Sequence, residues 1–296
     1  MTESEPQRFR IPFGRRGALA RPIMRMRGWL LLTIGLQAGE LLAHPESEVA
    51  VAELTRWIER TPQQPSLWFA RSVHHRDHGR WDAAEADLVA TERLAPHHPG
   101  LDLAFAQVFL ETRRWAKARQ RAERVLAEDD RAAAAHLLKA RACSRLGDTH
   151  QARASYSRAL SLLDEPTPEL FLERTALPAT VEVRLAELEE AMARVGAAHV
   201  LMLKALELEI AAGRTEAALG RIDRLAAHSE RQETWLKRKG DLLAASGRPN
   251  EARLAYRQSR AAIAALPDWL QKSPTLLGLV DDLQRAQEKL PLIQHP

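Results

Sequence analysis

The apolar and small residues of the chain repeat with a step of 34 residues. Gly79, Arg113 and Gly147 mark turns that are one step apart, and Gly213 and Gly247 are again one step apart. An alanine follows each turn at a constant distance. These alanines keep the 34-residue step in two series, Ala50, Ala84, Ala118 and Ala152 in the first half of the chain and Ala218 and Ala252 in the second. The interval from Gly147 to Gly213 is two steps less two residues. One shorter repeat of 32 residues therefore lies between them.

Within each unit the pattern predicts two helices joined by a tight turn. The first helix carries a small residue at the eighth position of the unit, namely Ser72, Ala106, Ala140 and Gly240. The second helix carries a later bulky position, occupied by Leu88, Tyr156, Ile222 and Tyr256, and Ala122 departs from this pattern. Paired helices approach closely where a small side chain faces a bulky one. One pair cannot bury both of its faces, so neighbouring pairs are expected to stack.

This unit resembles the tetratricopeptide repeat (TPR), in length and in the placing of its small, bulky and turn residues. The resemblance implies an all-α fold, a right-handed α-solenoid of helix pairs with an N-terminal half repeat and a C-terminal capping helix. It spans about residues 46 to 267. The half repeat covers 46–60 and the final helix covers about 275–290, while the expected units between them are 65–98, 99–132, 133–166, 167–198, 199–232 and 233–267.

Three segments are expected in the chain as a whole. Residues 1–43 are a leader and signal peptide or N-terminal anchor, residues 44–267 form the repeat array, and residues 268–296 form the capping helix and tail. Prolines 166, 168 and 178 make the fourth unit irregular.

Composition supports helices and argues against a nucleic-acid partner. Hydrophobic residues make up 45% and charged residues 28% of the chain, and alanine, leucine, arginine and glutamate dominate. The formal net charge is +4, but seven arginines between Arg8 and Arg27 precede any periodic segment. The net charge of the residues after Arg27 is close to zero. The basic stripe with interleaved aromatic residues that is typical of nucleic-acid binding is therefore missing from the sequence.

The N-terminus has the order of a secretory signal. Arg25 and Arg27 precede the apolar run 28–36, and Ala43 is a small residue at a cleavage point before His44. Translation from Met24 or Met26 would give a signal of ordinary length. We therefore expect export to the periplasm or cell envelope. An uncleaved membrane anchor and a cytosolic protein with a buried first helix are the alternatives, and membrane contact is expected only through this segment.

The sequence contains no catalytic constellation that would make the protein an enzyme, and no cofactor is expected. His74 and His78 lie on one helical face, but no acid at the spacing of a metalloprotease helix accompanies them, so we predict no metal site. His44 could chelate copper only as a mature N-terminus. Cys143 is the single cysteine and is expected to be a small buried residue. Six of the seven tryptophans, including Trp57 and Trp269, are interpreted as packing residues.

The resemblance also implies where a partner would bind, because first helices line the groove of TPR domains. Carried over position by position, the expected peptide-binding groove contains Phe69, Val73, Arg76, Leu103, Gln107, Leu110, Leu137, Arg141, Arg145 and Glu207. The same positions of the last unit are Lys237 and Asp241.

The expected ligand of this groove is an acidic or C-terminal peptide with hydrophobic anchors, held by the groove arginines. The alternative is that these arginines pair with Asp77 and Glu111 and keep the groove soluble. The sequence thus favours a non-catalytic scaffold that binds a protein or peptide. The alternatives are a metal- or small-molecule-binding accessory protein that uses the histidine-rich first repeat, and a cytosolic regulator.

Overall fold

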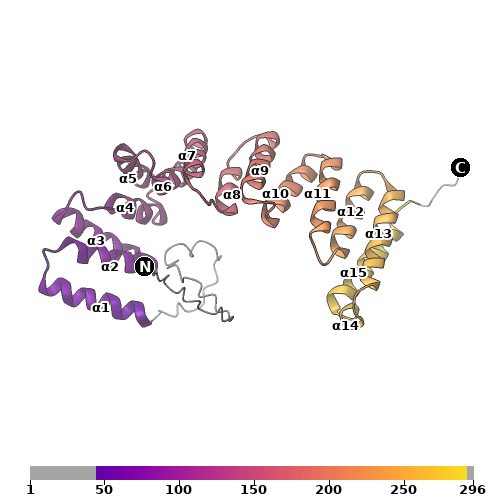
Figure 1. Cartoon of the computed structure of the whole chain (residues 1–296), viewed down its shortest axis with the longest axis horizontal. Coiled ribbons are helices and arrows are strands. Elements are labelled where there is room, and N and C mark those ends of the chain that lie inside the picture. The colour runs from indigo at the N-terminus through magenta and orange to yellow at the C-terminus, as the bar shows by residue number, and fades with distance from the viewer. Residues whose placement is uncertain (1–44, 292–296) are drawn as a thin grey trace, which may run out of the picture. The chain divides into compact units, whose positions relative to one another are not determined.

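The computed structural model describes residues 45–291, and this part of the chain consists of fifteen helices without any strand (Figure 1). The expected leader, residues 1–43, and His44 lie outside the described residues. None of the helices between residues 45 and 291 combines the length and the apolar character needed to cross a membrane. The helices are α1 (Pro45–Arg60), α2 (Pro65–Asp77), α3 (Trp81–Leu94), α4 (Leu101–Glu111), α5 (Trp115–Glu128), α6 (Ala133–Arg145), α7 (Thr149–Leu162), α8 (Pro168–Thr175), α9 (Val181–Val195), α10 (His199–Ala211), α11 (Thr215–Ala227), α12 (Glu233–Ala245), α13 (Pro249–Ala264), α14 (Asp268–Gln271) and α15 (Pro274–Glu288).

The helices pair as the 34-residue step predicts. Each expected unit holds one contacting pair, from α2 with α3 to α12 with α13, and α1 stands before them as a half repeat. The predicted all-helical fold of stacked helix pairs is confirmed. The fourth unit is irregular because its first helix, α8, ends at Thr175 after only eight residues. Pro178 follows closely, and a residue that precedes a proline is driven out of the helical region.

The small residue at the eighth position permits the close approach of the paired helices. Ser72, Ala106, Ala140 and Gly240 are all buried. At Gly240 the space is smallest, since an added Cβ would lie 2.3 Å from Cε1 of Tyr256. The Tyr256 hydroxyl donates a hydrogen bond to Oδ1 of Asp241 at 2.9 Å. The predicted contact of a small residue with a bulky one therefore holds α12 against α13.

The turn between paired helices requires a left-handed backbone at one residue. Gly79, Gly147, Gly213 and Gly247 have φ values between +67° and +80° there. The equivalent residue of the second unit is Arg113, with φ of +59°, and it is the one non-glycine residue with positive φ among residues 45–291. Glycine adopts this conformation freely, whereas a side chain makes it costly.

At four of these five turns the next residue is an arginine that reaches back to a carboxylate of the preceding unit, whereas Asp148 follows Gly147. Arg80 pairs with Glu48 at 3.0 Å, and Arg214 pairs with Glu182 at 2.6 Å. Arg114 holds Glu85 in the same way, and its hydrogen bonds lower the pKa of that carboxyl. Because folding lowers this pKa, the stabilising contribution is present at neutral pH and is lost as the pH falls through the folded-state value.

A buried ion pair joins the two helices of the fifth unit, α10 and α11. Arg221 of α11 is 2% exposed and donates to both oxygens of Glu209 at 2.8 and 2.7 Å. It also donates to Glu189 of the preceding unit at 2.6 Å. A buried pair of this kind is costly to break, because the remaining charge loses its partner without regaining water.

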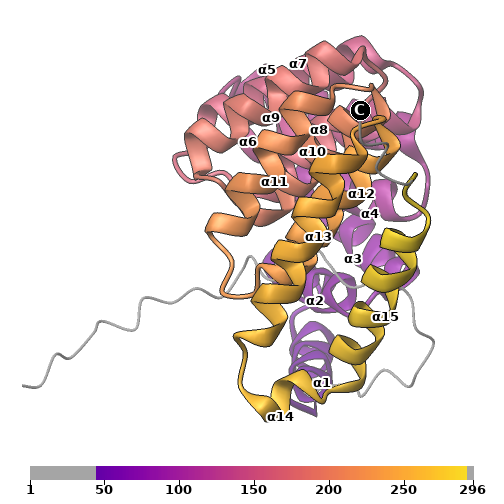
Figure 2. The same ribbon diagram turned by 90° about the vertical axis from the view of Figure 1, so that its right-hand side faces the viewer.

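The last helix closes the array. Leu276 and Leu283 of α15 are 1% and 0% exposed and share an apolar cluster with Ile263 and Tyr256 of α13. Figure 2 shows α15 running alongside α12 and α13, which it contacts. The predicted capping role of the C-terminal helix is confirmed.

Two tryptophans that we interpreted as packing residues are exposed instead. Trp57 of α1 is 53% exposed and Trp269 of the short helix α14 is 75% exposed. Trp57 belongs to a half repeat: α1 contacts the first helix of the next unit, α2, but among the described residues it has no first helix in its own unit. Trp269 lies on the connection between the last pair and α15, outside the repeat pattern that justified the interpretation.

Replacing Arg113 with glycine should raise the free energy of unfolding by about 0.5 to 1 kcal/mol, because the relief of backbone strain exceeds the added chain entropy. Chemical denaturation followed by circular dichroism measures this. Gly147→Ala is the matched control and should destabilise by about 1 kcal/mol. An added Cβ at Gly147 meets no atom within 4 Å, so the control changes backbone strain alone. Unchanged stability of Arg113→Gly would contradict the assignment of strain to this turn.

Candidate functional site

The first helices of the units form one continuous surface along parts of the array. Contacts join α2 to α4, α4 to α6, and α8 to α10, and at the end of the array α12 contacts α15. Side chains that point away from the second helices are therefore neighbours on this first-helix face. This is the surface on which the sequence predicted a groove.

Most residues of the predicted groove lie at least partly exposed on first helices. Arg145 and Glu207 are exposed. Six others are half-buried, and these are Phe69, Val73, Arg76, Leu103, Gln107 and Leu110. The ring of Phe69 lies 4.5 Å from that of His98, measured between centroids, so the loop between the first two units partly covers it.

Two of the predicted groove residues serve the interior of the protein instead. Leu137 is 4% exposed and belongs to the same apolar cluster as Phe171 of α8, so it cannot line a surface. Arg141 donates two hydrogen bonds to Glu173 of α8, at 2.8 and 2.9 Å. The Tyr156 hydroxyl donates a further bond to Glu173 at 2.9 Å, and burial together with the charge of Glu173 raises the pKa of Tyr156. These contacts fix Arg141 as a link between units.

The remaining groove arginines differ in their contacts. Arg76 pairs with Asp77 at 3.1 Å, which agrees with the alternative that this arginine keeps the surface soluble. Arg145 is exposed and forms no ion pair with any residue between 45 and 291. The expected basic middle of the groove is therefore reduced to Arg145.

The histidines and the cysteine are the sequence's candidates for metal binding or catalysis in the described part of the chain. Nδ1 of His78 lies 2.7 Å from the His74 carbonyl oxygen, and no cluster of three or more histidine, cysteine or acidic side chains able to hold a metal occurs in residues 45–291. Burial lowers the pKa of His75, which lies 3.8 Å from Asp87. Cys143 is fully buried and burial raises the pKa of its thiol, so its expected packing role is confirmed.

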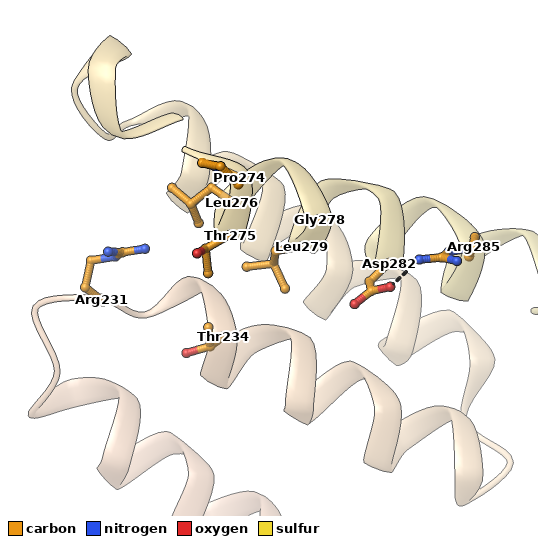
Figure 3. Close-up of a pocket in the computed structure, with 9 residues that line it drawn as sticks. All are labelled: Arg231, Thr234, Pro274, Thr275, Leu276, Gly278, Leu279, Asp282 and Arg285. Atoms are coloured by element: carbon orange, nitrogen blue, oxygen red, sulfur yellow. Dashed lines mark hydrogen bonds and ion pairs between the residues drawn. The ribbon is translucent and has the colours of Figure 1, made fainter. Parts of the chain in front are cut away.

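The first-helix face is hollowed at its C-terminal end, between α12 and α15. Two adjoining cavities of about 370 and 650 Å³ share Asp282 and Arg285 and so form one groove. Figure 3 shows Arg231 and Thr234 on one side of it and the α15 residues from Pro274 to Arg285 on the other. We call this feature the α12–α15 groove.

The α12 wall of the groove is formed by Thr234, Lys237, Asp241 and Ala244. These are the second, fifth, ninth and twelfth residues of the unit that begins at Glu233, the positions at which the sequence placed Lys237 and Asp241. The α15 wall was missed, because α15 follows the last full unit and the 34-residue step assigns it no register. Two basic residues one helical turn apart, Arg285 and Lys289, are the signal that could have indicated it.

A family model described as the tetratricopeptide repeat matches residues 103–168, which span the α4–α7 helix pairs. Residues 103–168 are thus tetratricopeptide repeats, and the described helix pairs share that fold. A comparison with curated proteins gave no significant match.

Solved structures share the fold of this chain at low sequence identity. A tetratricopeptide repeat protein from Parabacteroides merdae aligns with 13% identity and a TM-score of 0.51, over 81% of this chain and 93% of its own. The C-terminal part of a TPR repeat-containing protein from Cytophaga hutchinsonii aligns with 9% identity and a TM-score of 0.51, over 83% and 90%. Naa15/Naa10 bound to HypK-THB aligns with 14% identity and a TM-score of 0.51. That match covers 82% of this chain but 39% of the other.

Replacing Arg141 with methionine should destabilise the protein by about 1 to 3 kcal/mol, because Glu173 loses the guanidinium that donates two hydrogen bonds to it. Urea denaturation of the purified variant measures this. Arg145→Met, on the same helix, is the matched control and should change the stability by less than about 0.5 kcal/mol. Similar small effects of both substitutions would show that Arg141 is free for a ligand, as the sequence alone predicted.

Proposed function

We propose that this protein is a non-catalytic scaffold that binds a segment of a partner protein on its first-helix face. The observation that carries the proposal is the α12–α15 groove, which lies at the repeat positions that face ligands in the family it resembles. A repeat array offers a large surface built from rigid helices, and such surfaces are suited to extended partners.

The ionisable groups of the described residues support a binding role over a catalytic one. The carboxyls with lowered pKa, such as Glu85 and Glu92, owe the shift to arginines that bind them as structural partners. Cys143 is a buried thiol with a raised pKa, which disfavours the thiolate form that nucleophilic catalysis needs. Among the structural relatives, the Naa15/Naa10 assembly is bound to HypK-THB, so that protein of similar fold occurs in a complex.

Site-specific photocrosslinking in living cells tests the proposed surface. A benzophenone amino acid placed at Gln107 of α4 or Thr234 of α12 should cross-link a partner protein, because both positions lie on the first-helix face. The matched control is Val89 of α3, a second-helix residue that is 52% exposed. It should give no adduct. Adducts at Val89 with none at Gln107 and Thr234 would place the partner on the opposite face and contradict the proposal.

We also propose that the scaffold works in the periplasm or cell envelope. Support comes from the sequence of the leader, whose basic residues, apolar run and small residue at Ala43 follow the order of a secretory signal. These residues lie outside the part of the chain that the structure describes.

The proposed export predicts the N-terminus of the mature protein. Protein isolated from the envelope fraction of its own cells should begin at or near His44, because cleavage would follow Ala43. Mass spectrometry of the intact protein measures this. A cytosolic protein that retains residues 28–43 would contradict export and leave the binding role untouched.

A further inference from the structure

We infer that the α12–α15 groove binds an acidic, extended segment of a partner protein. This inference rests on the proposed function and deepens it, because it names one part of the first-helix face and the chemistry of its ligand. Three features of the groove carry it, namely its shape, its balance of charge and a glycine in its wall.

The shape of the groove suits a peptide chain. The two adjoining cavities of about 370 and 650 Å³ run along α12 and α15 and are open to solvent along one side. Their accessible apolar lining is Leu279, Ala244 and Leu290, with Leu276 and Tyr256 buried beneath it. A long, open and partly apolar channel can hold alternate side chains of an extended segment while the others remain in water.

The lining of the groove carries more positive than negative charge. Four basic side chains line it, Arg231, Lys237, Arg285 and Lys289, against two acidic ones, Asp241 and Asp282. The two acids are already paired, since Lys237 binds Asp241 at 2.8 Å and Arg285 binds Asp282 at 2.6 Å.

The basic side chains of the groove can donate hydrogen bonds to carboxylates of a ligand. Arg231 reaches the buried Glu233 at 2.5 Å, and Lys289 forms no ion pair with the described residues. Exposed ion pairs contribute only about 0 to 1 kcal/mol, so a ligand carboxylate can compete for Lys237 and Arg285 at little cost. Glu233 offsets the charge of Arg231, so the groove keeps a net excess of one positive charge, carried by Lys289, and this favours an acidic ligand over a basic one.

A glycine inside α15 leaves the groove wall without a side chain. Gly278 lies in the middle of the helix, where glycine costs about 1 kcal/mol relative to alanine. Neither packing nor backbone geometry demands it, because an added Cβ would meet no atom within 4 Å and its φ is not positive. Because no side chain projects into the groove at Gly278, the backbone of a ligand can approach α15 closely.

Fluorescence anisotropy with synthetic peptides tests the inference on the purified protein. The probe is a short fluorescent peptide of alternating glutamate and leucine, and its counterparts carry lysine or glutamine in place of glutamate. The glutamate peptide should bind most tightly, and its affinity should fall as the salt concentration rises. Equal affinity for the three peptides, or no binding of the glutamate peptide, overturns the inference.

Charge variants locate the bound peptide. The double variant Arg285→Ala and Lys289→Ala should weaken binding of the glutamate peptide by about tenfold or more, because two charge-assisted contacts are lost. Arg257→Ala and Arg260→Ala form the matched control, since they remove the same charge from exposed positions of α13 outside the groove lining. The control should change the affinity by less than about twofold. Equal losses in both double variants would mean that the peptide responds only to net charge, which overturns the inference.

A side chain added at the glycine provides an independent test. Gly278→Leu should abolish peptide binding while the helical circular dichroism signal is kept, because leucine fills the groove. Gly220→Leu in α11 is the control: an added Cβ there also meets no atom within 4 Å, and Gly220 does not line the groove. If Gly278→Leu does not fold, Gly278→Ala is measured instead. It should stabilise the helix and still weaken peptide binding, by less than leucine would.

Retained binding in a folded Gly278 variant overturns the inference. The photocrosslinking result is separate from these measurements. Adducts at Gln107 with no binding of the glutamate peptide would leave the scaffold role standing and reject the α12–α15 groove as an acidic-peptide site.

Discussion

The close approach of two helices at one small residue is the constraint on which four of the six helix pairs depend. At Gly240 any side chain would collide with the ring of Tyr256, so α12 and α13 can pack at their observed distance only because that position has none. Alanine or serine plays the same part in three other units. Once the pairs are fixed at this distance, their outer apolar faces remain uncovered. Stacking against the next pair follows as the way to bury them.

Ionic contacts add a directional link to this apolar stacking. Burial of apolar surface does not by itself specify how one pair is positioned on the next, whereas a bidentate arginine–carboxylate pair does. Arg221 joins Glu209 of its own unit to Glu189 of the unit before. Arg141 joins the third unit to Glu173 of the shortened fourth unit. These arginines are thereby used inside the array, so few remain for a ligand.

This use of arginine explains what the sequence could and could not predict. The 34-residue step predicted the helix pairs, the turns and the small-to-bulky contact, because each depends on residues close together along the chain. It could not predict that Arg141 is paired, since its partner lies 32 residues away across an irregular unit. Trp57 and Trp269 were misinterpreted because a periodic pattern cannot show where the array ends.

The end of the array is also where the geometry of the first-helix face changes. Between the internal units α2, α4 and α6, the next first helix packs directly against the one before and fills the space beside it. After α12 no further unit follows, and α15 takes the neighbouring place with a sequence that is free of the repeat pattern. α15 buries Leu276 and Leu283 as a cap must, yet it presents Gly278, Arg285 and Lys289 around a groove. Because no further helix pair packs against a capping helix, the residues on its exposed side need not match the repeat pattern. That side can therefore acquire a binding role that an internal helix cannot.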